Sequence, residues 1–230
     1  MQKKQSVNVL EKKLLAIALI YVVKLWGDKH YECFLQQPKP GELMDEWFEK
    51  FLAEWGVART IKRDERENIR EYLDHDFREM LSEGNEGKAV DDAAKYIQQQ
   101  GWGSRIRNNG KGSLPISIVS KVGFFFCPYK LVPLDKFAKQ GLNKLRKHED
   151  ERKIKGDSYN EYLKAFNKQY IKNKPQLAAA LGKQWVKDLA KELGCPASAL
   201  KNIAMRRKLF DNYLMELAKN SRHIKKETSG

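Results

Sequence analysis

The sequence predicts an all-α protein built as two helical lobes, and three observations lead to this prediction. Apolar residues recur at helical spacing along most of the 230-residue chain, and no segment alternates convincingly between apolar and polar residues. Glycine- and proline-containing breaks, such as PKPG (38–41) and SEGNEG (82–87), separate the periodic stretches. The charge of the chain changes sign near residue 100 and again at residue 41, which favours a division into lobes.

We expect helices wherever the apolar period persists between these breaks. The predicted ranges are 9–26, 43–55, 63–81, 88–99, 114–126, 134–147, 158–171, 177–193 and 197–218. Ser158 with Glu161 fits a capping box, and Pro196 followed by Ser198 suits another helix start. Pro175 is expected to interrupt the helical pattern between two of these ranges.

The first predicted helix contains the apolar run LLAIALIYVV (14–23), which follows two lysines as a signal peptide would. Lys24 and Trp26 close the run after about ten residues, and no small-residue cleavage site follows. We therefore expect a buried first helix, a cytoplasmic protein and no membrane partner.

Basic residues dominate the second half of the chain. Residues 1–40 carry a net charge of +4, residues 41–100 carry −7 and residues 101–230 carry +17, within a total of +14. A basic block of this size is typical of a protein that binds a polyanion, with double-stranded DNA first and an anionic membrane second. We expect a mixed to acidic helical lobe over 1–100, a basic helical lobe over 101–220 and a frayed tail over 221–230.

Cysteine and histidine spacing predicts neither disulfides nor a metal site. Cys33, Cys127 and Cys195 lie far apart, and the four histidines are scattered without partners. We expect a reducing compartment, no transition metal, no cofactor and a monomer.

One aspartate, Asp135, stands directly behind an apolar stretch in KVGFFFCPYKLVPLDKF (121–137). Val132-Pro133-Leu134 leads into a predicted helix, so Asp135 falls at its head. When an N-glycosidic bond breaks, positive charge builds on the sugar, and a nearby carboxylate stabilises that charge. The dipole and N–H groups of a helix N-terminus favour the ionised form that this role needs. The other interpretation is that Asp135 only caps the helix.

Lys121, on the apolar helix upstream, is a second candidate for catalysis. Burial favours the neutral amine of a lysine, which can attack the sugar and so cleave the strand as well as remove the base. A lysine that keeps its charged end in water while its stem packs on apolar groups is the alternative.

Three segments resemble the helix–hairpin–helix DNA glycosylase superfamily. LVPLDKFAKQGLNKL (131–145) is similar to the segment in which an apolar-Pro-apolar lead brings the catalytic aspartate to the start of a helix at the active-site cleft. LPISIVSK (114–121) is similar to the hairpin whose lysine is the Schiff-base nucleophile of bifunctional members, and RRKLFDNYLMELAK (206–219) is similar to the closing helix of divergent members. The resemblance implies a two-lobed helical fold, base flipping, and catalytic roles for Asp135 and Lys121.

The hairpin departs from the family pattern. The family places glycines where backbone N–H groups approach a phosphate, whereas this chain has Ile116, Ser117 and Ile118 there. A different grip on DNA is therefore expected.

A second informative segment is GWGSRIRNNGKGS (101–113), which combines cationic, amide and glycine residues in a loop. Such a loop can present donors to phosphates, and Trp102 can stack on a base, although a plain solvated linker has the same composition. The residues expected to contact DNA are Arg105, Arg107, Asn108, Lys111, Ser120, Lys136 and Lys139.

These observations favour a DNA glycosylase that flips and excises a damaged or modified base, for example a modified cytosine of phage DNA. Two alternatives stay open. One is a DNA-binding recognition module without catalysis, in repair or antiviral defence. The other is a helical adaptor whose acidic 41–100 segment binds a basic protein.

Overall fold

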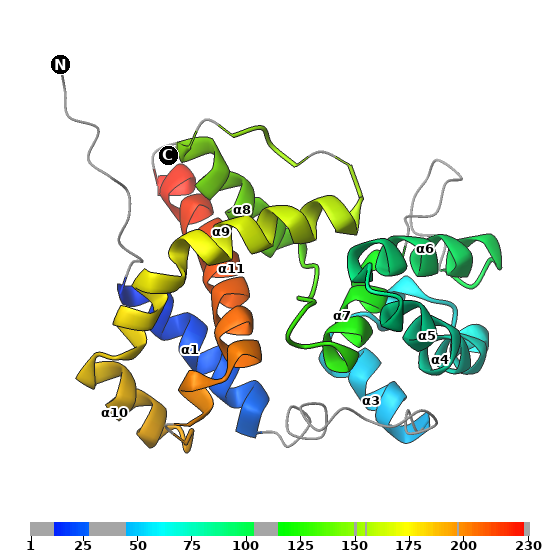
Figure 1. Ribbon diagram of the computed structural model, residues 1–230, viewed down its shortest axis with the longest axis horizontal. Coiled ribbons are helices and arrows are strands. Elements are labelled where there is room, and N and C mark those ends of the chain that lie inside the picture. Colours follow the sequence, from blue (N-terminus) through cyan, green and yellow to red (C-terminus); the bar gives the residue numbers. More distant parts are fainter. Residues whose placement is uncertain are drawn as a thin grey trace. The chain divides into compact units, whose positions relative to one another are not determined.

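The computed structural model describes residues 12–27, 45–103, 115–149, 151–154, 156–196 and 198–227. Every named element in these ranges is a helix (Figure 1), which confirms the predicted all-α class. Among the described residues one isolated bridge pairs Ile61 with Gly103. The chain forms two compact units. Unit 1 combines residues 1–30, 135–154 and 165–230, and unit 2 combines residues 31–134 and 155–164.

Unit 1 is built around its last helix. Its elements are α1 (Lys12–Gly27), α8 (Lys136–His148), most of α9 (Tyr159–Leu181), α10 (Gln184–Glu192), η3 (Ala199–Lys201) and α11 (Ile203–Glu227). Helix α11 packs against both α1 and α8 (Figure 1). The predicted burial of the first helix is confirmed, because Leu15, Ala18, Leu19 and Val22 are each no more than 1% exposed. None of the described helices is long and apolar enough to cross a membrane.

Helices α8 and α11 approach closely at a glycine. A Cβ atom added at Gly141 would lie 1.9 Å from the backbone oxygen of Leu214. Only a residue without a side chain allows this separation between the two helix backbones. Lys144, one turn further along α8, donates its Nζ to the carbonyl oxygen of Leu217 at 2.9 Å.

Unit 2 surrounds an almost wholly buried helix. Its elements are α3 (Asp45–Glu54), η1 (Ala58–Thr60), η2 (Arg63–Glu65), α4 (Arg66–Asp74), α5 (Asp76–Ser82), α6 (Glu86–Gln99), α7 (Ile116–Phe126) and the first turns of α9. Every residue of α7 except Ser117 is buried, and α7 packs against α5 and α6. Such a helix is apolar on all faces because it has neighbours on all faces.

The start of α9 is fixed by α6. Asp91 of α6 accepts hydrogen bonds from the backbone N–H groups of Tyr159 (2.6 Å) and Asn160 (3.1 Å) and from the Ser158 hydroxyl (2.9 Å). The predicted cap is confirmed, since the Ser158 hydroxyl accepts from the N–H of Glu161. Gly87 permits this approach, because a Cβ there would lie 2.6 Å from the Asn160 side-chain oxygen.

Several predicted helix boundaries are wrong. The range 177–193 is divided between α9 and α10, and the last helix begins at Ile203 and not at residue 197. The helix expected over 63–81 is broken at His75, because the Arg78 side chain binds both the carbonyl oxygen (3.1 Å) and the carboxylate (2.5 Å) of Asp74. Conversely, α9 continues through Pro175. Pro175 and Ile171, whose carbonyl loses its partner to the proline, are both exposed, so water can satisfy that carbonyl.

The boundaries between the two units also lie at other positions than the predicted boundary at residue 100. Helix α1 packs on α11 near the other end of the sequence, whereas α7, which follows residue 100, packs on α6. Burial of the apolar faces of α1 and α7 decides these pairings, and the charge break in the sequence carries no information about them.

We predict that Gly141→Ala destabilises unit 1 by about 1–3 kcal/mol, because the new methyl group overlaps the α11 backbone. The midpoint of urea-induced unfolding, followed by circular dichroism, measures this change. Gly182→Ala is the matched control, since a Cβ there meets neighbouring atoms only at 3.5 Å or more. An unchanged midpoint in Gly141→Ala would contradict the tight α8–α11 contact.

Candidate functional site

The candidate site begins with a short extended segment, residues 131–134, that connects α7 to α8. Leu131, Val132 and Pro133 are buried, yet the segment has no neighbouring strand among the described residues. A buried backbone N–H without a partner is costly, so each one needs a hydrogen-bond acceptor from elsewhere.

Side chains supply most of these partners. The Tyr159 hydroxyl accepts from the N–H of Val132 (3.1 Å) and donates to the Val132 carbonyl oxygen (2.6 Å). The N–H of Leu131 bonds to the carbonyl oxygen of Cys127 at 2.9 Å. Pro133 has no N–H to satisfy. Proline therefore suits position 133, between Val132, which Tyr159 holds, and Leu134, which Ser120 holds.

Ser120 holds the residue that precedes Asp135. Its hydroxyl accepts from the N–H of Leu134 at 3.0 Å and donates to the carbonyl oxygen of Ser117 at 3.2 Å, and Ser120 itself is fully buried. Ser117 adds a longer bond of 3.4 Å to the Leu134 carbonyl oxygen. Ser120 was predicted to contact DNA; its hydroxyl instead binds the backbone that leads into Asp135.

Asp135 is the N-cap of α8, as the alternative interpretation of the sequence expected. Its backbone is extended (φ −117°, ψ 146°), and its Oδ1 accepts from the N–H of Phe137 at 2.7 Å. The side chain is half-buried, and its Oδ2 accepts no hydrogen bond from the described residues. One carboxylate oxygen is thus committed to the helix, and the other keeps its lone pairs for another partner.

Lys121 lies on α7 but points away from any solvent-filled space. It is 8% exposed, its Nζ donates to the carbonyl oxygen of Trp55 at 2.7 Å, and it lies 5.9 Å from the centre of the Trp55 ring. Trp55 directly follows α3, whose last turn contains no basic residue of its own. Lys121 therefore supplies positive charge at the C-terminus of α3, where it is favourable.

Of the remaining residues predicted to contact DNA, two lie in the described part of the chain and four do not. Arg105, Arg107, Asn108 and Lys111 lie outside the described residues. Lys136 and Lys139 lie in the first turn of α8, next to Asp135, with Lys136 exposed and Lys139 half-buried.

Trp102 belongs to an aromatic cluster. Tyr72 and Tyr96 stack with their ring centres 4.4 Å apart, and Trp102 meets them edge-on at 6.3 and 5.9 Å. Burial, with a smaller contribution from Asp76, raises the pKa of Tyr72 to about 12. Trp102 is half-buried, so only part of its ring can serve the base stacking that was predicted for it.

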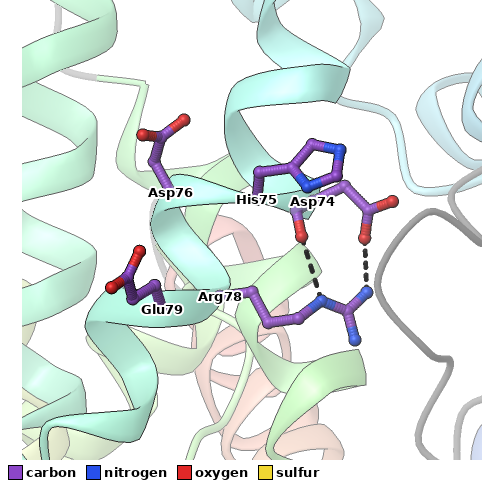
Figure 2. Close-up of a pocket in the computed structure, with 5 residues that line it drawn as sticks. All are labelled: Asp74, His75, Asp76, Arg78 and Glu79. Atoms are coloured by element: carbon purple, nitrogen blue, oxygen red, sulfur yellow. Dashed lines mark hydrogen bonds and ion pairs between the residues drawn. The ribbon is translucent and has the colours of Figure 1, made fainter.

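A shallow pocket at the α4–α5 junction collects several charged side chains. Figure 2 shows Arg78 directed at Asp74, whereas Asp76 and Glu79 project on the other side of the backbone. The acid that is buried, Asp74 at 1% exposure, is neutralised by Arg78. Asp74 is therefore committed to Arg78.

Metal ligands and reactive thiols do not gather in the described part of the chain. No group of three or more His, Cys, Asp or Glu side chains is placed to hold a metal ion in that part. Burial raises the pKa of both the Cys127 and the Cys195 thiol, which lowers their reactivity.

Comparison of the chain with protein-family models, with curated proteins and with solved structures gives no match. The resemblance to DNA glycosylases therefore stays a prediction from the segments quoted above.

Sequence reasoning did not identify Tyr159 or Asp91, the side chains that hold the extended segment and the start of α9. A tyrosine at a helix start and an aspartate in mid-helix have no local pattern that indicates such roles. Ser120 was singled out by the sequence as a DNA contact, and no local pattern indicated its hydrogen bond to the N–H of Leu134.

We predict that Ser120→Ala destabilises the protein by about 1–3 kcal/mol, because it leaves the N–H of Leu134 buried without an acceptor. Urea-induced unfolding measures the effect. The control is Ser82→Ala, which removes an exposed hydroxyl bonded to the Glu79 carbonyl and should change stability by less than about 0.5 kcal/mol. Equal effects of the two substitutions would mean that the Ser120 bond does not fix the extended segment.

Proposed function

We propose that the protein is a DNA glycosylase that excises a damaged or modified base, with Asp135 as the carboxylate that stabilises the transition state. In this reaction the bond between the sugar C1′ and the base breaks, and the base leaves with the bonding electrons. Asp135 stabilises the positive charge on the sugar, and water then adds to C1′ to give an abasic site.

The observation that carries the proposal is the way in which Asp135 is held. The residues before it are buried and fixed by Ser120 and Tyr159, and its own Oδ1 is fixed by the N–H of Phe137. Its second oxygen, Oδ2, stays available to face the sugar, as electrostatic stabilisation requires.

The first turn of α8 supports an anionic substrate. It contains no acidic residue, while Lys136 and Lys139 place positive charge at the helix end where the dipole favours negative groups. Two lysines there are unfavourable for the helix alone. They become favourable when a phosphate lies nearby.

The position of Lys121 favours base removal by hydrolysis, without cleavage of the DNA strand. Its amine is buried and bonded to the Trp55 carbonyl oxygen, so it is committed to the C-terminus of α3. We therefore assign Lys121 a positioning role in unit 2.

A recognition module without catalysis is the second candidate, and one observation favours it. Asp135 forms an ordinary N-cap bond, which explains an aspartate at this position without any reaction.

Substitution Asp135→Asn distinguishes the two candidates. The amide oxygen of asparagine can still accept from the N–H of Phe137, because asparagine caps helices as well as aspartate does. The negative charge is lost. We expect Asp135→Asn to retain its fold and DNA affinity but to lose base excision by at least about 100-fold. The assay incubates full-length protein with duplexes carrying damaged or modified bases and detects abasic sites by alkaline cleavage.

Asp157→Asn, at an exposed position that precedes α9, is the matched control and should excise as the wild type does. Loss of excision in both variants would contradict the specific catalytic role assigned to Asp135. DNA binding without abasic sites in the wild type, on every duplex tested, would favour the recognition module.

We also predict that borohydride traps no covalent complex between the wild-type protein and a cleavable duplex, because no amine attacks C1′. The readout is a shift of the protein band in a denaturing gel. Trapping that disappears in Lys121→Met would restore Lys121 as a nucleophile and would contradict its positioning role.

A further inference from the structure

The two units differ sharply in charge. Unit 1 contains 27 basic and 11 acidic side chains, a net charge of +16, whereas unit 2 contains 17 and 19, a net charge of −2. The positive charge of the whole protein therefore resides in unit 1. A polyanion is attracted to that unit in particular.

Many of the described basic side chains of unit 1 already have acidic partners. Lys168 and Arg146 bind Glu151 at 2.7 and 2.9 Å, and Lys172 binds Glu149. Within α11, Lys208 binds Asp211 and Lys219 binds Glu216, both at 2.6 Å. These cations stabilise the packing of α8, α9 and α11 and are poorly placed to bind a ligand.

Helix α10 differs, because its lysines are exposed and unpaired. Lys183, the N-cap residue, is followed by Lys187 and Lys191 at four-residue intervals, and no carboxylate of the described residues lies within ion-pair distance of them. Four residues make slightly more than one helical turn, so the three ammonium groups form a line along one flank, with steps of about 6 Å. We name this set the α10 lysine line.

The face of α10 on one side of the lysine line is occupied by the protein. Val186 and Ala190 are buried, α10 packs against α1, and Lys12 of α1 lies 5.2 Å from the centre of the Trp185 ring (Figure 1). The helix is therefore held in unit 1 with its lysine line directed outward.

The structure assigns the α10 lysine line a function: we infer that it binds the phosphate backbone of duplex DNA. The choice of DNA rests on the proposed function. A line of cations about 6 Å apart can neutralise several phosphates of one strand, because each strand carries one negative charge per about 3.4 Å along the duplex axis. These residues are distinct from Asp135 and from the basic residues of the 101–113 segment that the sequence predicted to contact DNA.

An anionic membrane fits the same helix less well. A helix that lies on a membrane inserts an exposed apolar face between the lipids. The apolar residues of α10 are turned inward, and Gln184, Asp188 and Glu192 occupy the flank beside the lysine line, with Gln184 donating to Asp188 at 2.8 Å. This acidic flank repels phosphate and confines DNA to the lysine side.

The test replaces the three lysines with glutamine in the full-length protein and measures affinity for an undamaged duplex over a series of salt concentrations. Loss of three phosphate contacts should make the slope of log K against log salt shallower by about 2.7 and weaken binding about tenfold or more at low salt. The matched control replaces Lys50, Lys88 and Lys95 of unit 2, which are exposed and ion-paired, and changes the net charge equally. We expect the control to leave the slope unchanged.

A second variant tests the opposite change in charge, the removal of negative charge. Asp188→Asn combined with Glu192→Gln removes negative charge beside the lysine line and should tighten DNA binding. Equal effects of the two lysine triples, or an unchanged slope in the α10 triple, would overturn the inference. So would a loss of binding to phosphatidylserine-rich vesicles with DNA affinity unaltered.

The outcomes are independent of excision. If the triple lysine variant has a shallower salt-dependence slope but the wild type produces no abasic sites from any duplex, the α10 lysine line binds DNA and the proposed glycosylase activity is wrong. If the wild type excises a base but the triple lysine variant has an unchanged salt-dependence slope, the proposed glycosylase activity is supported and the DNA-binding role of the α10 lysine line is wrong.

Discussion

The extended segment before Asp135 is the constraint on which the candidate site depends. Residues 131–133 are buried and Leu134 is half-buried, with no neighbouring strand among the described residues, so side chains must satisfy much of their backbone. Two hydroxyls do this, those of Ser120 on α7 and Tyr159 on α9. Tyr159 in turn keeps its place because Asp91 binds the start of α9 and Gly87 lets α6 come close. A continuous chain of contacts thus extends from α6 to the residue before Asp135.

The basic residues of the protein divide into two physical classes. Some neutralise carboxylates or helix ends, as Arg78 does at Asp74 and Lys121 does at the end of α3. Others, such as those of the α10 lysine line, are exposed to water and contribute little to stability. The second class matters for binding, because a cation without a partner releases more counterions when it meets a phosphate. Net charge alone cannot separate the two classes; ion-pair geometry can.

The sequence predicted the all-α class and the head of α8, because apolar periodicity and the Val-Pro-Leu-Asp lead are local signals. It did not predict the break at His75 or the continuity of α9 through Pro175, because each depends on a side chain or on solvent exposure that the local pattern does not contain. Tertiary pairing was also out of reach: the contact of α1 with α11 joins residues from opposite ends of the chain. Within the candidate site, Asp135 and Ser120 were identified, whereas the roles of Tyr159, Asp91 and Lys121 follow from contacts between distant segments.

The cap formed by Asp135 and the catalysis proposed for it do not exclude each other. An N-cap needs one acceptor oxygen, and Oδ1 provides it at 2.7 Å from the N–H of Phe137. Stabilising a cationic sugar needs a second oxygen with negative charge and a fixed position. The cap is compatible with both needs, because it fixes the carboxylate through Oδ1 and leaves Oδ2 without a hydrogen bond from the described residues. The bond that explains the aspartate structurally is therefore compatible with the proposed chemistry at Oδ2, and only a substitution that keeps the cap while removing the charge can separate the two roles.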